Sequence, residues 1–251
     1  MDLKKSLLLI TLIVSSSGCS TVAGAKLIFP EAFGLEKIHS NIYVELNAKK
    51  EDKQKIIQAL SDAQVLLKTV YGSVESIPAI NVCITEECYE SFGGMGSKAK
   101  IYGKYVLLSP RGIDRHYIAH EWSHLEIRER LGLLAWYRLP QWFDEGLAVL
   151  VSDSPDHSEK HWEKLVEFDI NRPTRSELMG LISLRDWLNA VKKYGSTKNA
   201  ERKAAGEMEV RPVYTAAGNE VRLWFNEAKT DGLLLLISEL KAGSRLNEIY
   251  K

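Results

Sequence analysis

The sequence predicts an α+β fold, with a small β-sheet and a helix in the N-terminal half and an all-helical C-terminal half. Two observations lead to this prediction. Short alternating segments rich in β-branched and aromatic residues lie before residue 110. After residue 114, apolar residues recur at helical spacing between capping residues and glycine stops. The 251 residues, of which 45% are hydrophobic, suit one catalytic domain or two small ones.

The N-terminal half is predicted to contain the strands of the fold. We expect a tether at 19–36 after an export signal at 1–18, and then a single domain at 37–251. Within this domain the pattern predicts strands at 42–46, 79–85 and 101–108, the last interrupted by Gly103, and a helix at 52–71 that Gly72 ends.

The C-terminal elements are helices. Asp114 can cap a helix that runs to about Leu131, and Gly132 is its stop signal. Pro140 suits the first turn of the next helix, which runs towards Ser152. Further helical stretches are predicted at 157–169, 183–194, 212–228 and 231–241.

The charges of the chain balance. Lys plus Arg and Asp plus Glu each number 33, so the formal net charge is zero. Proteins that bind nucleic acid usually carry a surplus of basic residues. The composition therefore argues against nucleic acid as a partner.

The first 18 residues have the order of an export signal. Lys4 and Lys5 precede an apolar run at 7–14, and small residues follow at 15–18. This run is shorter than the roughly 18 residues that a transmembrane helix needs. The order therefore predicts export rather than membrane insertion.

Ser17-Gly18-Cys19-Ser20 resembles a bacterial lipobox, although Ser16 stands where leucine is usual. This resemblance implies cleavage before Cys19 and a lipid on Cys19 that anchors the protein in the membrane. Because Ser20 is not aspartate, it also implies the outer membrane, with the protein facing the periplasm. The alternative is a plain cleaved signal with an incidental cysteine.

The two remaining cysteines are Cys83 and Cys88. In an oxidising compartment their close spacing predicts a local disulfide. Half of a second metal site is the alternative, but no nearby histidine or cysteine pair completes it.

His120-Glu121-Trp122-Ser123-His124 is an HExxH pattern. On a helix, residues four apart share one face, so both imidazoles can reach one Zn²⁺ ion. Glu121 can then take a proton from a water whose pKa the ion has lowered. The alternative is a pair of helix histidines without a ligand role.

Glu145 lies 21 positions after His124, on the next predicted helix. Two helices joined by a short connection can face each other, so its carboxylate can supply a third protein ligand. The alternative is an acidic residue that stabilises the first turns of a helix.

HExxH followed by Pro-x-Trp-x-x-Glu-Gly-x-Ala at 140–148 resembles the gluzincins, the thermolysin-like superfamily of zinc metallopeptidases. The similarity is clearest over 113–151. It implies a zincin-like fold and one zinc ion per chain, bound by His120, His124 and Glu145. It also implies Glu121 as general base.

Other residues have roles that the resemblance implies less specifically. Asp144 has no ligand role in the pattern but can hold a histidine N–H. The strand at 101–108 matches the edge along which extended substrate adds in this family, or is an ordinary strand. Tyr214 is the candidate donor to the oxyanion, with core packing as its alternative.

Three further histidines are candidates for a role at the site. His157 and His161 are rivals of Tyr214 as oxyanion donors, or plain surface residues. His116 lies one turn before His120, but it lacks the family position and a solvated or capping role fits it better.

Together these features predict a membrane-tethered periplasmic zinc peptidase that acts on peptide or protein substrates, as an endopeptidase. A non-catalytic lipoprotein with an assembly or binding role is the alternative, and Glu121 argues against it. Another zinc hydrolase is a third possibility. Two imidazoles and a carboxylate also accept other divalent ions.

Overall fold

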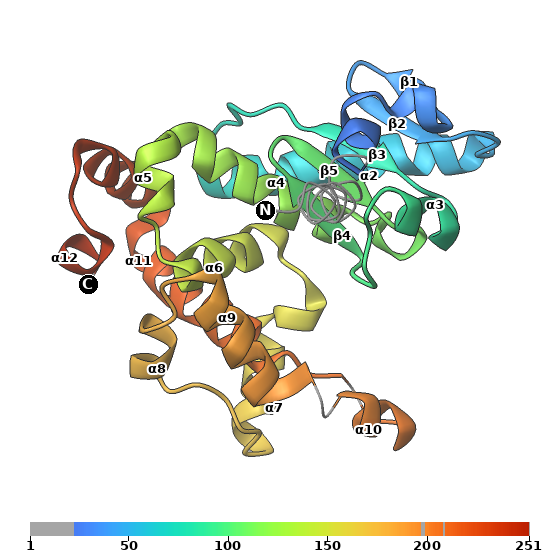
Figure 1. Ribbon diagram of the computed structural model, residues 1–251. Coiled ribbons are helices and arrows are strands. Elements are labelled where there is room, and N and C mark those ends of the chain that lie inside the picture. The colour runs from blue at the N-terminus through green and yellow to red at the C-terminus, as the bar shows by residue number, and fades with distance from the viewer. Residues whose placement is uncertain (1–22, 197–198, 208, 251) are drawn as a thin grey trace, which may run out of the picture. The chain divides into compact units, whose positions relative to one another are not determined.

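The computed structural model describes residues 23–250 apart from 197–198 and 208. The predicted signal and Cys19 lie outside these residues. The fold is α+β, as predicted, with strands before residue 110 and helices after residue 114 (Figure 1). The chain forms two compact units. Of the described residues, the first unit comprises those up to Gln58 together with Ile77–Asp114, and the second comprises Ala59–Ser76 and those from Arg115 onward. Among the described helices, none has both the length and the apolar character needed to cross a membrane.

The first unit contains a mixed five-stranded sheet in the order β1-β2-β3-β5-β4. β1 pairs antiparallel with β2, and β4 with β5, whereas β3 runs parallel to both β2 and β5. The strands are β1 (Leu35–His39), β2 (Ile42–Glu45), β3 (Ala79–Val82), β4 (Ala99–Tyr102) and β5 (Tyr105–Leu108).

The prediction of one strand over 101–108 was wrong. The segment belongs to a hairpin, in which β4 ends at Tyr102 and β5 begins at Tyr105. Gly103 has a φ of 62°, a left-handed conformation that suits a tight turn between strands. β4 is an edge strand of the sheet and β5 is not. The binding of substrate along this edge stays a prediction.

The segment predicted as a tether also carries structure. A 3₁₀ helix, η1, covers Pro30–Phe33, and β1 follows it directly. Leu27 and Leu35 are buried in a cluster with Phe92 and Leu107. Burial of these side chains orders the segment, and a reading of local patterns alone could not foresee it.

Cys83 and Cys88 form the predicted disulfide, between the end of β3 and α3 (Glu86–Ser91). Both thiols are therefore consumed, which removes the alternative of a cysteine metal site in this segment.

In the sequence, α2 (Lys50–Tyr71) and α3 lie between strands, and the helices from α4 onward come after the last strand, β5. Two of them were predicted closely, α4 and α6. The predicted stretches 212–228 and 231–241 form one element, α11, with a kink at Lys229. The helical elements are η2 (Pro110–Gly112), α4 (Arg115–Leu131), α5 (Leu133–Tyr137), α6 (Gln141–Ser152), η3 (Pro155–His157), α7 (Glu159–Glu167), α8 (Arg175–Met179), α9 (Leu184–Val191), η4 (Lys192–Ser196), α10 (Asn199–Ala204), α11 (Pro212–Ala242) and α12 (Leu246–Ile249).

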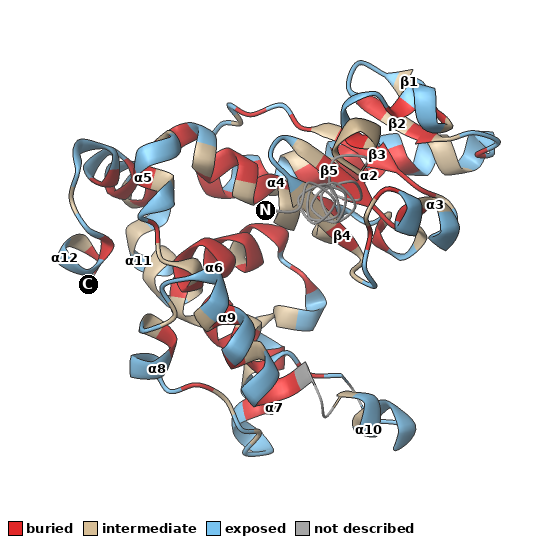
Figure 2. Cartoon of the chain, viewed as in Figure 1, coloured by how far each residue is buried: buried red, intermediate tan, exposed pale blue. Residues whose placement is uncertain are grey.

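In the second unit α6 packs between α4 and α11 and is buried along most of its length (Figure 2). Two glycines allow the close approach of α6 and α11. A Cβ atom on Gly146 would lie 2.6 Å from the carbonyl oxygen of Ala217, and one on Gly218 would overlap the Val149 side chain. Gly146 follows Glu145 directly and Gly218 lies four residues after Tyr214. The glycine contact therefore determines how closely the helices that carry Glu145 and Tyr214 approach each other.

Candidate metal centre

α4 presents its two motif histidines on one face, as the helical period requires. The ring centroids of His120 and His124 lie 5.0 Å apart, and the rings are nearly perpendicular. Ile118, Trp122 and Leu125 bury the rest of this stretch against the second unit's core. The histidines are therefore fixed by a helix that apolar packing stabilises.

α6 supplies the carboxylates. Pro140 is its N-cap, so Asp144 and Glu145 lie in the first turns, and both are buried. Gln141 donates from Nε2 to Oε1 of Glu145 over 3.1 Å. Asp144 Oδ1 lies 3.0 Å from Nδ1 of His124, where the resemblance placed a partner for a histidine N–H. Such a bond leaves Nε2 of His124 free to bind a metal.

The three predicted ligands come together. One ligand atom each from His120, His124 and Glu145 can be chosen so that all lie within 4.8 Å of one another. Oε2 of Glu145 is 3.4 Å from Nε2 of His120 and 3.9 Å from Nε2 of His124. Tetrahedral zinc with bonds of about 2.0–2.1 Å places its ligand atoms roughly 3.3–3.4 Å apart. The donor set therefore fits such an ion with small adjustments.

Glu145 has an unsatisfied oxygen. Its Oε2 atom is buried and accepts no hydrogen bond from the described residues. Buried polar atoms usually have a partner, and an exception requires an explanation such as an ion. A divalent cation between Glu145 and the two histidines would provide that partner.

The electrostatics of the cluster reflect concentrated charge. Burial would lower the pKa of His124, but the Asp144 carboxylate raises it to about 10. Burial would raise the pKa of Glu145, but the nearby rings of His120 and His124, together with the Gln141 amide, lower it. The two shifts favour the charged forms of His124 and Glu145.

Glu121 lies on α4 between the two histidines and makes no hydrogen bond to any described residue. Burial is the largest influence on its pKa, which is raised, although His120 and His124 oppose the shift. A raised pKa makes a carboxylate a stronger proton acceptor, and the side chain is free to approach a reacting group because no hydrogen bond holds it.

Tyr214 belongs to the same region. Its ring centroid lies 6.4 Å from that of His120, stacks on His157 at 5.7 Å and meets the edge of Trp187 at 4.9 Å. Burial raises the pKa of Tyr214, so its hydroxyl stays protonated at neutral pH. A protonated hydroxyl held between two rings is suited to donate a hydrogen bond.

The three remaining candidate histidines have surroundings that differ from those of His120 and His124. His157 is no plain surface residue: its Nδ1 lies 3.2 Å from the Thr215 hydroxyl, and burial lowers its pKa to about 3. His161 is buried beside it, with ring centroids 6.5 Å apart. His116 places Nδ1 2.6 Å from the carbonyl oxygen of Ser152 and is not among the clustered ligands.

Sequence reasoning missed two contributors. Trp187 contacts Tyr214 from α9, and Gln141 orients Glu145 from within α6. The spacing of Gln141 four residues before Glu145 could have indicated the second contact. No local pattern pointed to Trp187, because its partner lies 27 residues away.

Searches against models of protein families, characterised proteins and solved structures give no match.

Proposed function

We propose that this protein is a zinc-dependent metallopeptidase with a zincin-like catalytic domain of the gluzincin type. The observation that supports it most is the buried, unsatisfied Oε2 of Glu145 facing the two motif histidines. His120, His124 and Glu145 would hold the ion, leaving a position for water or substrate, as in catalytic zinc sites. Bound zinc supplies Lewis acidity, which polarises a peptide carbonyl and favours deprotonation of water.

Glu121 acts as the general base in this proposal. It removes a proton from the attacking water and passes it to the leaving amine. The absence of any hydrogen bond to Glu121 within the described part of the chain supports this role, because a structural carboxylate would be paired.

Tyr214 donates a hydrogen bond to the developing oxyanion. His157 and Trp187 hold its ring from two sides and so restrict its rotation. His157 is the rival donor, since its low pKa keeps it neutral and its other ring nitrogen is available after the contact with Thr215.

The cellular setting of the proposal comes from the sequence. A lipid on Cys19 would anchor the protein in the outer membrane, facing periplasmic peptide or protein substrates. Labelling with a radioactive fatty acid tests this part, and Cys19→Ala should abolish the label. A labelled C19A protein would overturn it.

The non-catalytic lipoprotein is the competing function. A structural zinc site tends to be closed by a fourth protein ligand. Within the described residues the cluster contains three ligands, which favours catalysis.

The decisive experiment measures zinc content and peptide hydrolysis together. Wild type should bind about one zinc ion per chain and cleave unfolded protein substrates, H120A should lose both properties, and E121Q should lose only hydrolysis. E121Q is the matched control, because it changes one atom type and leaves the ligands in place. A wild-type protein that takes up no zinc on titration would overturn the proposed function.

A further inference from the structure

A separate cavity lies on the face of α11 opposite Tyr214. Ala216, Asn219, Glu220 and Leu223 line it from α11. At about 100° per residue these positions centre about 180° around the helix from Tyr214. The cavity has a volume of about 520 Å³, within the range of small-molecule sites. It is therefore distinct from the candidate metal centre.

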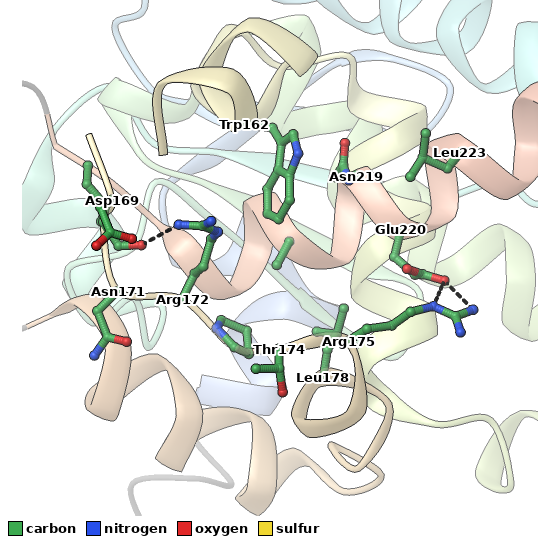
Figure 3. A pocket seen from close by; sticks show the side chains of 13 residues that line it. Trp162, Asp169, Asn171, Arg172, Thr174, Arg175, Leu178, Asn219, Glu220 and Leu223 are labelled. Carbon is green, nitrogen blue, oxygen red and sulfur yellow. Dashed lines mark hydrogen bonds and ion pairs between the residues drawn. The ribbon is translucent and has the colours of Figure 1, made fainter. Parts of the chain in front are cut away.

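One wall of the cavity is aromatic. Trp162 of α7 faces it, and the guanidinium carbon of Arg172 lies 5.4 Å from the centroid of its ring (Figure 3). Arg172 is fixed in place, because its Nη1 donates to the carbonyl oxygens of Leu165 and Ile170 over 3.0 and 2.9 Å. Pro173 and Leu178 are buried and give the cavity an apolar base.

Several polar groups around the cavity are unpaired. The side-chain amides of Asn171 and Asn219, the indole N–H of Trp162 and the Nε and Nη2 groups of Arg172 make no hydrogen bond to any residue that the structure describes. An amide offers both donors and an acceptor. In Figure 3, Arg172 and Asn219 lie on either side of Trp162, and Asn171 lies at the edge of the cavity beside Asp169. Such groups can receive a ligand with hydroxyl or amide groups.

The charges around the cavity balance. Arg175 pairs with Glu220 over 2.9 Å, and the other charged residues of the lining are one cation, Arg172, and one anion, Asp169. A paired carboxylate and guanidinium give no net attraction for a charged ligand. Neutral polar ligands are therefore favoured over anions and cations.

We propose that this cavity is a binding site for a neutral carbohydrate of about disaccharide size. A pyranose ring has a face of C–H groups that can pack on the part of the Trp162 ring that Arg172 leaves uncovered, and a rim of hydroxyls that each donate and accept. Asn171, Asn219 and the free edge of Arg172 would meet that rim. The site would hold a glycan independently of the metal centre.

The test is calorimetric titration of the purified full chain with cellobiose, maltose and N,N′-diacetylchitobiose. At least one should bind with a Kd of about 1 mM or lower. W162A and N219A should each weaken that binding about tenfold or more, whereas Y137A, which changes an exposed aromatic residue on α5, should not.

Three results would overturn the proposal. None of the three sugars binds, or binding is unchanged in both W162A and N219A, or N-acetyl-dialanine binds more tightly than every sugar and loses affinity in R172A. The last result would make the cavity an anion site. N219A serves where W162A fails to fold, and the unfolding midpoint of each variant shows which case applies. Because the readout is sugar binding, it does not depend on whether the metal centre is active.

Discussion

α4 carries two buried polar clusters that differ in how fully they are bonded. The first is the candidate metal centre around His120 and His124, in which Glu145 keeps an oxygen without a hydrogen bond. The second lies around Glu126, two residues further along. Both oxygens of Glu126 accept hydrogen bonds, from the backbone N–H groups of Glu75 and Ser76, the Ser76 hydroxyl and the Nε group of Arg130.

The difference in bonding is the one expected between a structural cluster, around Glu126, and a binding site, around Glu145. The Glu126 cluster fixes the segment 73–76 to α4, since Arg130 also bonds Ser73 and Trp122 donates to the Ser76 hydroxyl. A buried carboxylate that is fully paired adds order, whereas an unpaired one lowers stability unless something binds it. The candidate metal centre is therefore the part of α4 whose polar groups are suited to bind a cation.

The largest expected effect comes from a substitution in the candidate metal centre. E121Q should lower kcat for peptide hydrolysis about 10³-fold, because the base is lost while the ligands remain. Its zinc content should equal that of wild type, measured by atomic absorption on the same preparation. Undiminished turnover in E121Q would remove Glu121 from the mechanism.

A substitution in the Glu126 cluster should instead lower the stability of the protein. E126A leaves Arg130 and the 75–76 amides without their acceptor, so the free energy of unfolding should fall by about 3 kcal/mol or more. Urea titrations with and without chelator should show the same loss. E145A is the contrasting variant, since its effect should vanish once zinc is removed. An E126A protein that loses zinc but not stability would reverse the comparison.

Asp144 is not among the three clustered ligands, but it contacts one of them, His124. D144N should weaken zinc binding about 10–100-fold, as the loss of such supporting partners usually does. Competition with a fluorescent zinc chelator measures the change. Equal affinity in D144N and wild type would show that the contact does not orient His124.

The smallest effect concerns His157, which borders the metal centre through Tyr214. Its folded-state pKa is about 3, against about 6.5 in the unfolded chain, so the unfolded state binds the extra proton first. Stability must then fall as pH decreases, by about 2 kcal/mol between pH 7.5 and pH 5 from this residue alone.

H157Q should remove this part of the pH dependence. The comparison uses urea midpoints of metal-free wild type and H157Q at both pH values, so that the other titrating groups cancel. Identical pH slopes in the two proteins would show that His157 is accessible to protons in the folded state.

The grouping of His120, His124 and Glu145 could be predicted because its signals lie in two short segments. HExxH depends on one turn of helix, and Glu145 follows a proline that begins the next helix. The zinc ion, the peptidase activity and the lipid anchor stay predictions. The Glu126 cluster could not be foreseen, since its partners lie about 50 residues earlier and have no periodic pattern. The burial of Leu35 in β1 could not be foreseen either, since its neighbours Phe92 and Leu107 lie far along the chain. The β4–β5 hairpin is local, and the interruption at Gly103 could have indicated its turn.

The close packing of α6 and α11 at Gly146 and Gly218 has a practical use in sequence comparison. At both positions even a methyl group would collide with the facing helix, so substitution should be rare in any chain that shares this arrangement. A search pattern could therefore join HExxH to Glu-Gly at 145–146 and to Tyr-x-x-x-Gly at 214–218. Such a pattern would select distant sequences by the helix geometry they must preserve, where overall identity is too low to align them.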